Sequence, residues 1–245
     1  MTFRYPQAVR QVLDHLERTQ SESIERAADL VVQAYRSGGA VFCSEVGHGI
    51  QGDFLNRAGG LAALQPFSFS FAVQDAVPAC LQERRKADGA DRELETVRLA
   101  VRTSSLRAGD VMVIGSVSGR NRRPVELALT CRERGVRTIG MTSMAYTSQV
   151  ASLHPSGKRL CDVVDVVVDI GAPYGDAAVE IPGMDIAVLP VSGVAFAVAG
   201  WMIWERVMSK MAAEGDPPTV FMSVNRPGGQ EYYEAARRRL NERGY

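Results

Sequence analysis

Residues 110–121 read Asp-Val-Met-Val-Ile-Gly-Ser-Val-Ser-Gly-Arg-Asn, an apolar, β-branched run that ends in a loop of glycine and small hydroxyl residues. Apolar positions from Val125 to Leu129 indicate that a helix comes next, and Gly135 ends it. A strand, such a loop and a helix N-terminus make an anion pocket, because backbone N–H groups and the positive end of the helix dipole face the ligand. We therefore predict that residues 116–121 bind a phosphate. The alternative is an ordinary turn in which Ser118 caps the helix.

The rest of the chain alternates short apolar runs with segments of helical periodicity. This alternation predicts an α/β fold with a parallel sheet covered by helices on both faces. The predicted strands are 40–44, 67–71 (a strand or an extended edge), 111–114, 136–141 and 163–168. The predicted helices lie at 13–37, 92–102, 125–134, 192–214 (capped by Ser192) and after 229. We expect an exposed loop at 81–91 and irregular structure at 171–190.

The composition excludes several classes of function. The 245 residues carry 28 basic and 28 acidic side chains, so the net charge favours neither nucleic acid nor an acidic membrane as a partner. The basic clusters at 84–86 and 237–239 are interpreted as solvated surface. The most apolar stretch, 194–204, is too short to span a bilayer and predicts a buried helix at a subunit interface.

Cysteine and histidine spacing argues against a metal site. The 4 cysteines stand far apart and there are only 3 histidines, which predicts free thiols in a reducing cytoplasm. Residues 1–18 lack the uninterrupted hydrophobic core of a signal peptide. We therefore expect a cytoplasmic protein.

The glycine loop at 47–52 supports a competing hypothesis. It satisfies the G-x-G-x-x-G template after a strand, and Asp75 falls near the offset of a ribose-binding acid. However, Glu45 precedes the glycines, where its charge would repel a pyrophosphate, and Gly59 and Gly60 cut the next helix short. A dinucleotide-dependent oxidoreductase is therefore the weaker interpretation.

Several segments together resemble the sugar isomerase (SIS) domain superfamily, and most closely its stand-alone phosphosugar isomerase-like proteins. The matching segments are 47–48, 57–61, 116–121, 142–143, 154–160 and 175–177. The resemblance covers nearly the whole chain, and 116–121 and 154–160 are its most specific parts. It implies a three-layer αβα sandwich with a five-stranded parallel sheet, formed as a single domain over 1–245.

The resemblance also implies the surroundings of the site. Residues 1–38 would form an N-terminal helical region, and 216–245 a C-terminal extension that packs on the core or on a neighbouring subunit. It further implies a homodimer or higher oligomer that binds a sugar phosphate near a subunit interface, with no metal or organic cofactor.

Relatives commonly carry Gly-x-Gly-His-Ser-His at the first loop. This chain has Glu45 in place of a glycine, Gly49 in place of the serine and Ile50 in place of the second histidine. The change removes a hydroxyl and an imidazole, so we expect the sugar to be recognised differently from that of close relatives.

The candidate phosphate-binding residues combine the hydroxyl loop with the loops that the resemblance adds. They are Ser116, Ser118, Gly119, Arg120, Asn121, Thr142, Ser143 and Gly47. Arg120 is included because a guanidinium binds phosphate in a fork. Asn121 has the alternative role of capping the helix.

The expected chemistry is proton abstraction next to a carbonyl, which isomerises a hexose or amino-sugar 6-phosphate once the sugar ring is open. The candidate catalytic residues are the carboxylates Glu180, Asp176 and Glu45 and the imidazoles His48 and His154. Structural alternatives exist for four of them. Glu180 and Asp176 would be solvated loop carboxylates, Glu45 would pair with an arginine, and His154 would hold its own loop.

Two other functions fit the same pocket. The enediol intermediate can instead expel a group from the third carbon, as in a dehydratase or lyase acting on an N-acetylamino-sugar 6-phosphate. A non-catalytic sensor of sugar phosphates is the alternative from a different class. About 37 residues precede the first strand, too few for a complete DNA-binding domain and linker.

Overall fold

Five parallel strands form the centre of the molecule, in the order β2-β1-β3-β4-β5. The computed structural model describes residues 3–74, 76–83 and 91–245. The strands are β1 (Val41–Ser44), β2 (Leu64–Phe67), β3 (Val111–Gly115), β4 (Arg137–Thr142) and β5 (Val166–Asp169). The predicted five-stranded parallel sheet is therefore confirmed.

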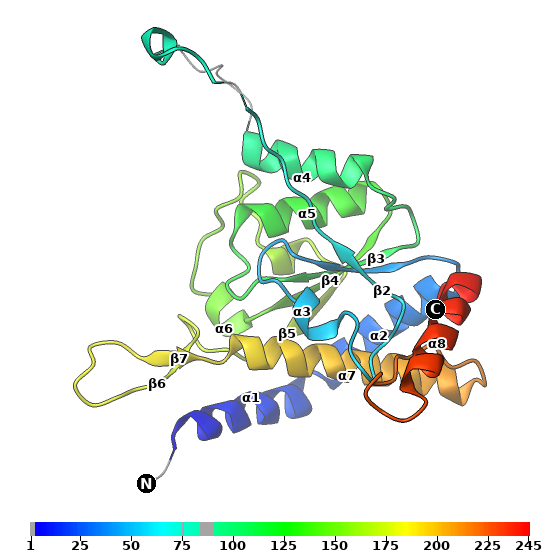
Figure 1. The fold of residues 1–245 in the computed structure, drawn as a ribbon. Coiled ribbons are helices and arrows are strands. Elements are labelled where there is room, and N and C mark those ends of the chain that lie inside the picture. Colours follow the sequence, from blue (N-terminus) through cyan, green and yellow to red (C-terminus); the bar gives the residue numbers. More distant parts are fainter. Residues whose placement is uncertain (1–2, 75, 84–90) are drawn as a thin grey trace.

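Helices cover both faces of this sheet and give the three layers that were predicted (Figure 1). One face carries α4 (Arg92–Thr103) and α5 (Arg122–Glu133); the other carries α1 (Tyr5–Thr19), α2 (Ser21–Arg36) and α7 (Ser192–Ala213). The central strand β3 is buried at every position, which explains why it reads as a continuous apolar run. Loops at its carboxyl end are thus attached to the most rigid part of the molecule.

Smaller elements complete the fold. They are α3 (Gln51–Phe54), α6 (Met144–Thr147), α8 (Gly229–Arg243), the 3₁₀ turns η1 (Ala79–Leu81) and η2 (Leu160–Asp162), and the strands β6 (Ala177–Val179) and β7 (Val188–Pro190). β6 and β7 pair antiparallel in a hairpin that projects from the body beside α1 (Figure 1). The prediction of irregular structure at 171–190 is wrong there, because short runs with alanine and a proline give no strand signal.

The edge strand β2 also differs from its prediction. Of the alternating run at 67–71, only Phe67 belongs to the strand, which begins at Leu64 and ends at Phe67. The segment after it is extended but not paired, and Phe71 is 61% exposed. Pro66, which cannot donate to a ladder, is tolerated within β2 because that strand lies at the sheet edge.

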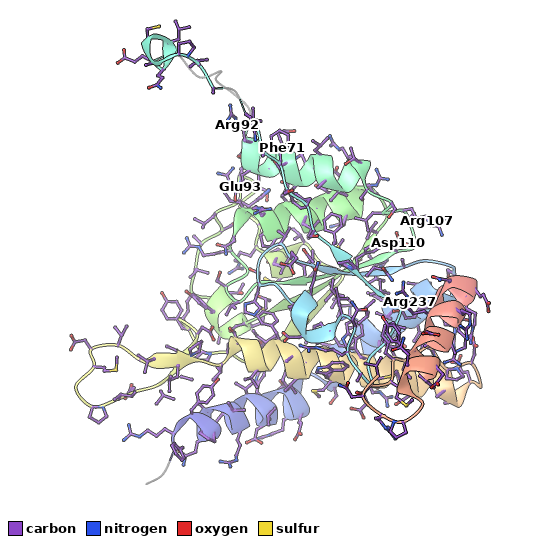
Figure 2. All side chains as sticks on the ribbon, viewed as in Figure 1. Phe71, Arg92, Glu93, Arg107, Asp110 and Arg237 are labelled. Carbon is purple, nitrogen blue, oxygen red and sulfur yellow. The ribbon has the colours of Figure 1, made fainter. Side chains whose placement is uncertain are left out.

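The C-terminal part of the chain packs on its own core. Ala236 of α8 is buried with Ala62 and Phe221, and the ring of Tyr245 stacks on Tyr35 with centroids 5.9 Å apart. Arg237 lies on α8, near the C-terminus of the chain (Figure 2). This part of the chain therefore stabilises the same subunit.

The charged stretch at 81–91 is only partly described. Most of it, including Arg84, Arg85 and Lys86, lies outside the described residues, and so does Asp75. In the part of the chain that the structure describes, no helix is both long and apolar enough to cross a membrane. All 4 cysteines lie in that part and are free.

A buried carboxylate fixes the amino ends of two strands. Asp110, which is 2% exposed, accepts hydrogen bonds from Ala40 N–H and Arg107 N–H, both at 2.9 Å. Asp110 and Arg107 lie close together near the start of β3 (Figure 2). The carboxylate thus joins the entry into β1 to the entry into β3.

We predict that Asp110→Ala lowers the free energy of unfolding by roughly 1–2 kcal/mol, because two N–H groups lose their acceptor. Asp110→Asn keeps one acceptor oxygen and should cost less. Urea denaturation monitored by circular dichroism measures both. Asp185→Ala, at an exposed position, is the control, and an equal loss in that variant would contradict the assignment.

Candidate functional site

Loops from neighbouring strands meet at the carboxyl edge of the sheet. Residues 116–121, which we call the anion loop, come after β3 and lie between the loop after β1 and the loop after β4. His48 N–H donates to Gly115 O at 2.8 Å, and Ser143 N–H donates to Val117 O at 2.9 Å. The predicted phosphate-binding segments are therefore in contact.

The carbonyl groups of the anion loop are held by protein donors. Four consecutive carbonyls, those of residues 117–120, accept hydrogen bonds from the segments after β4. The donors are Ser143 N–H to Val117 (2.9 Å), Thr147 Oγ1 to Ser118 (3.0 Å), Leu160 N–H to Gly119 (2.8 Å) and Leu153 N–H to Arg120 (3.0 Å). The loop therefore has one fixed side.

Several N–H groups of the same loop have no protein acceptor among the described residues. In a trans peptide a carbonyl and the next N–H point in opposite directions, so fixing the carbonyls also fixes the amides. Within the described residues, the N–H groups of Ser118, Arg120 and Asn121 have no protein acceptor, and the hydroxyls of Ser116 and Ser118 have no partner either. This is the hydrogen-bonding pattern that an anion requires.

The charges at the start of α5, the helix that follows the loop, also favour an anion. α5 begins after Asn121, whose side chain makes no capping bond, and its first turn contains Arg122 and Arg123 and no acid. The positive end of a helix dipole beside two arginines is unfavourable unless negative charge is supplied. Arg122 pairs with Asp91 and Glu93, while Arg123 lies over the Phe69 ring at 5.3 Å.

Two other long helices already have acids at their N-termini. Asp91 caps α4 by accepting from Leu94 N–H, and Glu93 stands in its first turn, beside Arg92 and Phe71 (Figure 2). Asp176 accepts from Ser192 N–H at 2.9 Å at the start of α7. Among these three helix ends, that of α5 is the one without a carboxylate cap.

Thr142 and Ser143 support the anion loop from beneath. Both are fully buried; Thr142 Oγ1 donates to Val117 O at 3.2 Å, and Ser143 Oγ donates to Ala172 O and accepts from Tyr146 N–H. Gly119, with φ +62°, lies so close that an added Cβ would be 2.9 Å from Thr142 Oγ1. Both hydroxyls are therefore used by protein groups, and the loop is held by the hydroxyl of Thr142 and the backbone N–H of Ser143.

The loop after β1 packs against the same edge. Gly47 has φ +97°, and a Cβ on it would lie 2.3 Å from Gly115 O, so glycine is required there. Its neighbour His48 is half-buried and stacks on Phe196 of α7, with ring centroids 4.3 Å apart. Glu45 is exposed, and its Oε2 lies 3.4 Å from where a Cβ on Gly49 would be. No ion pair links Glu45 to Arg57 or to another described residue.

Asp176 lies near His48 but is bound to α7. It adopts φ +62°, and its carboxylate accepts from Val191 N–H, Ser192 N–H and Ser192 Oγ. Ser192 was expected to cap α7; instead it is the first helical residue and donates to the real cap, which comes from 16 residues earlier. A non-glycine residue at positive φ that is held by three hydrogen bonds marks a site of stored strain.

Burial lowers the pKa of His48 below its ordinary value of 6.5, while the negative charges of Asp176 and Asp53 oppose that shift. The imidazole is therefore mainly neutral at pH 7. A neutral imidazole can both accept and return a proton, which is the requirement for opening a sugar ring.

Two other predicted catalytic residues, Glu180 and His154, have surroundings that differ from those expected of an acid or a base. Glu180 is exposed at the end of β6, on the projecting hairpin, where its carbonyl accepts from Arg4. His154 is 7% exposed, and both ring nitrogens are used: Nε2 bonds to Glu126 Oε2 at 2.7 Å and Nδ1 bonds to Ser156 Oγ at 2.7 Å. In the described chain, His154 matches its alternative interpretation as a residue that holds its own segment.

Three residues that support this site were not predicted from the sequence. Thr147 supports the anion loop, and Arg98 and Glu126 form a buried chain with His154. A signal existed for Glu126, since it stands between Val125 and Leu127 in an otherwise apolar helix segment. The described residues contain no group of three or more histidine, cysteine or acidic side chains that could hold a metal ion.

Comparison with known proteins agrees with the fold. A family model described as SIS domain matches residues 4–143. A UPF0309 protein of Listeria innocua is 32% identical over 235 residues, covering 95% of this chain and 92% of its own length. A UPF0309 protein of Streptomyces coelicolor is 34% identical over 238 residues, covering 94% of this chain and 92% of its own.

Among solved structures, the fold is similar to that of phosphoheptose isomerase GmhA from Neisseria gonorrhoeae. The TM-score is 0.51 at 15% identity, and the match covers 85% of this chain and 95% of the other. At this identity the likeness concerns the fold. The helix that follows the first glycine loop, α3, has only four residues. In this respect the loop differs from a dinucleotide-binding unit, in which the pyrophosphate lies at the N-terminus of a longer helix.

We predict that His48 titrates below 6.5 and that Asp176→Asn lowers its pKa further, because a negative charge that favours the imidazolium is removed. Asparagine tolerates the left-handed backbone and keeps an acceptor for the helix end. NMR titration of the His48 ring measures the shift, with Asp185→Asn as a distant control.

The same shift has a consequence for stability. The folded state binds a proton on His48 less readily than the unfolded state does. The contribution of His48 to the free energy of unfolding is therefore fully present above pH 6.5, and it is lost as the pH falls through the lower pKa of the folded state. An elevated pKa for His48, or an upward shift in Asp176→Asn, would contradict the assignment.

Proposed function

This chain belongs to the SIS domain family, and on that premise we propose that its anion loop binds the phosphate of a sugar phosphate. The observation that carries the proposal is the arrangement of residues 117–120, whose carbonyls are all fixed by protein donors while the amides of Ser118, Arg120 and Asn121 lack acceptors within the described residues. An anion loop built in this way is ready before the ligand arrives.

A phosphate ester suits the loop better than a carboxylate does. It carries about −1.5 to −2 charges and three acceptor oxygens at neutral pH. The loop offers several amides, the hydroxyls of Ser116 and Ser118 and the uncapped end of α5. Arg120 Nε is buried and, in the described part of the chain, has no hydrogen-bond partner, so this side chain can add a further donor.

The reaction that we propose is isomerisation of a hexose or amino-sugar 6-phosphate. With the phosphate anchored, the carbonyl end of the open-chain sugar is held near the loop after β1. A carboxylate removes the proton from the carbon beside the carbonyl, and the electrons form an enediolate. The proton then returns to the former carbonyl carbon, while the proton of the neighbouring hydroxyl passes to the former carbonyl oxygen. His48, neutral at pH 7, is assigned to ring opening.

Glu45 is the carboxylate that the geometry favours as the base. It is exposed, lies over Gly49 beside His48, and has no ion-pair partner among the described residues. Asp176 is the second candidate, but its two oxygens are engaged at the start of α7. Glu180 is the third.

Glu180 becomes relevant in an oligomer. The hairpin that carries it projects from the body and exposes Ile181, Met184 and Ile186, the last at 71%. Exposed apolar side chains on a projecting element are typical of subunit contacts. The proposal therefore includes a cytoplasmic homo-oligomer in which a hairpin meets a neighbouring subunit.

Two other functions share the loop and differ in the step after binding. Elimination by a dehydratase or lyase would begin with the same proton abstraction, whereas a sensor would bind without it. Thermal-shift screening of hexose and amino-sugar 6-phosphates, and then NMR of the best binder in deuterated water, separates them. Deuterium entering the second carbon of the aldose, together with formation of a ketose, marks an isomerase. Exchange with loss of a substituent marks an eliminating enzyme, and binding without exchange marks a sensor.

We predict that Ser118→Ala weakens binding of the best sugar 6-phosphate about tenfold, since one hydrogen bond to a charged oxygen is worth roughly 1.5 kcal/mol or more. Binding of the unphosphorylated sugar should not change. Isothermal titration calorimetry measures both, with Ser148→Ala, an exposed hydroxyl just after α6, as the matched control. Full affinity in Ser118→Ala would count against the loop as the phosphate site.

We also predict that Glu45→Gln keeps sugar-phosphate affinity within about threefold but slows deuterium exchange at the second carbon by roughly 10²-fold or more, as expected for loss of a general base. Glu180→Gln is the comparison variant. Slow exchange in Glu180→Gln together with normal exchange in Glu45→Gln would transfer the role of base to the hairpin.

A further inference from the structure

A chain of three polar side chains, two of them buried, joins three segments next to the anion loop. Arg98 of α4 donates through Nε to Glu126 Oε1 of α5, and Glu126 Oε2 bonds to His154 Nε2 at 2.7 Å. The side chains of Glu126 and His154 are each 5% exposed. These two groups are thus almost completely removed from water.

The hydrogen bonds fix the protonation pattern of His154. Ser156 N–H donates to His154 Nδ1 at 3.1 Å, so Nδ1 is an acceptor and Nε2 carries the hydrogen that is donated to Glu126. Burial raises the pKa of Glu126, but the bonds from Arg98 and His154 outweigh it and leave that pKa below its ordinary value. Glu126 is therefore an ionised carboxylate inside the protein.

An ion pair of this kind is a costly way to stabilise a helix interface. Apolar side chains of similar size often serve at least as well, because the Glu126 carboxylate must be stripped of water. What the carboxylate provides, and a leucine could not, is a directional anchor for His154. This hydrogen bond holds the segment around His154 against α5.

That segment holds two of the anion loop's four carbonyls. Leu153 N–H binds Arg120 O at 3.0 Å, and Leu160 N–H binds Gly119 O at 2.8 Å, on either side of His154 in the sequence. Because each carbonyl fixes the N–H of the next residue in its peptide plane, these two bonds orient the amides of Arg120 and Asn121.

Resting on the proposed function, we propose that Glu126 is a positioning residue for phosphate. Through His154 it holds residues 152–160 against α5, and these residues turn the amides of Arg120 and Asn121 toward the ligand. Glu126 itself does not touch the ligand.

The test compares two carboxylates that share one arginine. Arg98 also pairs with Glu95, at 2.8 Å, but Glu95 is exposed and has no link to His154. Glu126→Gln places an amide where two donors converge, so the bonds to Arg98 and His154 cannot both be kept. Glu95→Gln is the matched control.

We predict that Glu126→Gln weakens binding of inorganic phosphate about tenfold, the effect of misplacing one or two charge-assisted hydrogen bonds, while Glu95→Gln changes it less than about twofold. Phosphate titration monitored by ³¹P NMR gives the affinities. Hydrogen exchange of the backbone N–H groups of Leu153 and Leu160 gives a readout without ligand, and should quicken about tenfold or more in Glu126→Gln and not in Glu95→Gln.

His154→Ala is the second variant, because it releases the segment and leaves Glu126 paired with Arg98; the same two changes are expected. Unchanged exchange at Leu153 and Leu160 in both variants would overturn the positioning role, and so would undiminished phosphate affinity. The proposed function fails separately if the unsubstituted protein binds neither phosphate nor any sugar phosphate. In that case faster exchange in the variants would still show that Glu126 holds the segment, but its role toward phosphate would be rejected.

Discussion

The planarity of the trans peptide is the constraint on which this site depends. Four protein donors hold the carbonyls of residues 117–120 on one side of the loop, and each carbonyl directs the next N–H to the other side. The anion loop is therefore organised by its carbonyls, whose donors come from the segments after β4. Thr142, Ser143 and Thr147 carry out this work with their own hydroxyls or amides.

The N-terminus of α5 differs from those of α4 and α7 in the charges placed beside it. Asp91 neutralises the start of α4 and Asp176 neutralises the start of α7, whereas α5 begins with two arginines. Such an arrangement destabilises an isolated helix and becomes favourable when an anion is bound. The loop geometry and the helix electrostatics therefore arise from different residues and favour the same class of ligand.

The sequence was sufficient for the parallel arrangement of the sheet, for its inner strands and covering helices, and for the place of residues 116–121 between a strand and a helix. These features depend on local periodicity and on a hydroxyl-rich turn after a strand. Tertiary pairings carry no such signal. Glu126 and His154 stand 28 residues apart, and Asp176 caps a helix that begins 16 residues later. Likewise, Thr142 and Ser143 read the same in the sequence whether they face a ligand or a carbonyl. Only the partners of their hydroxyls in the folded chain distinguish the two roles.

The site has one rigid part and one exposed part. The anion loop is tied to β3, β4 and the buried Glu126 chain, while Glu45 is exposed on the loop after β1 and Glu180 on the hairpin. Binding energy collected at a substrate's unreactive end can serve to position its reactive end. Under the proposed function, a fold that fixes the phosphate through the anion loop can change its chemistry by replacing residues of the loop after β1. Glu45, Gly49 and Ile50 fall in that first loop and outside residues 116–121.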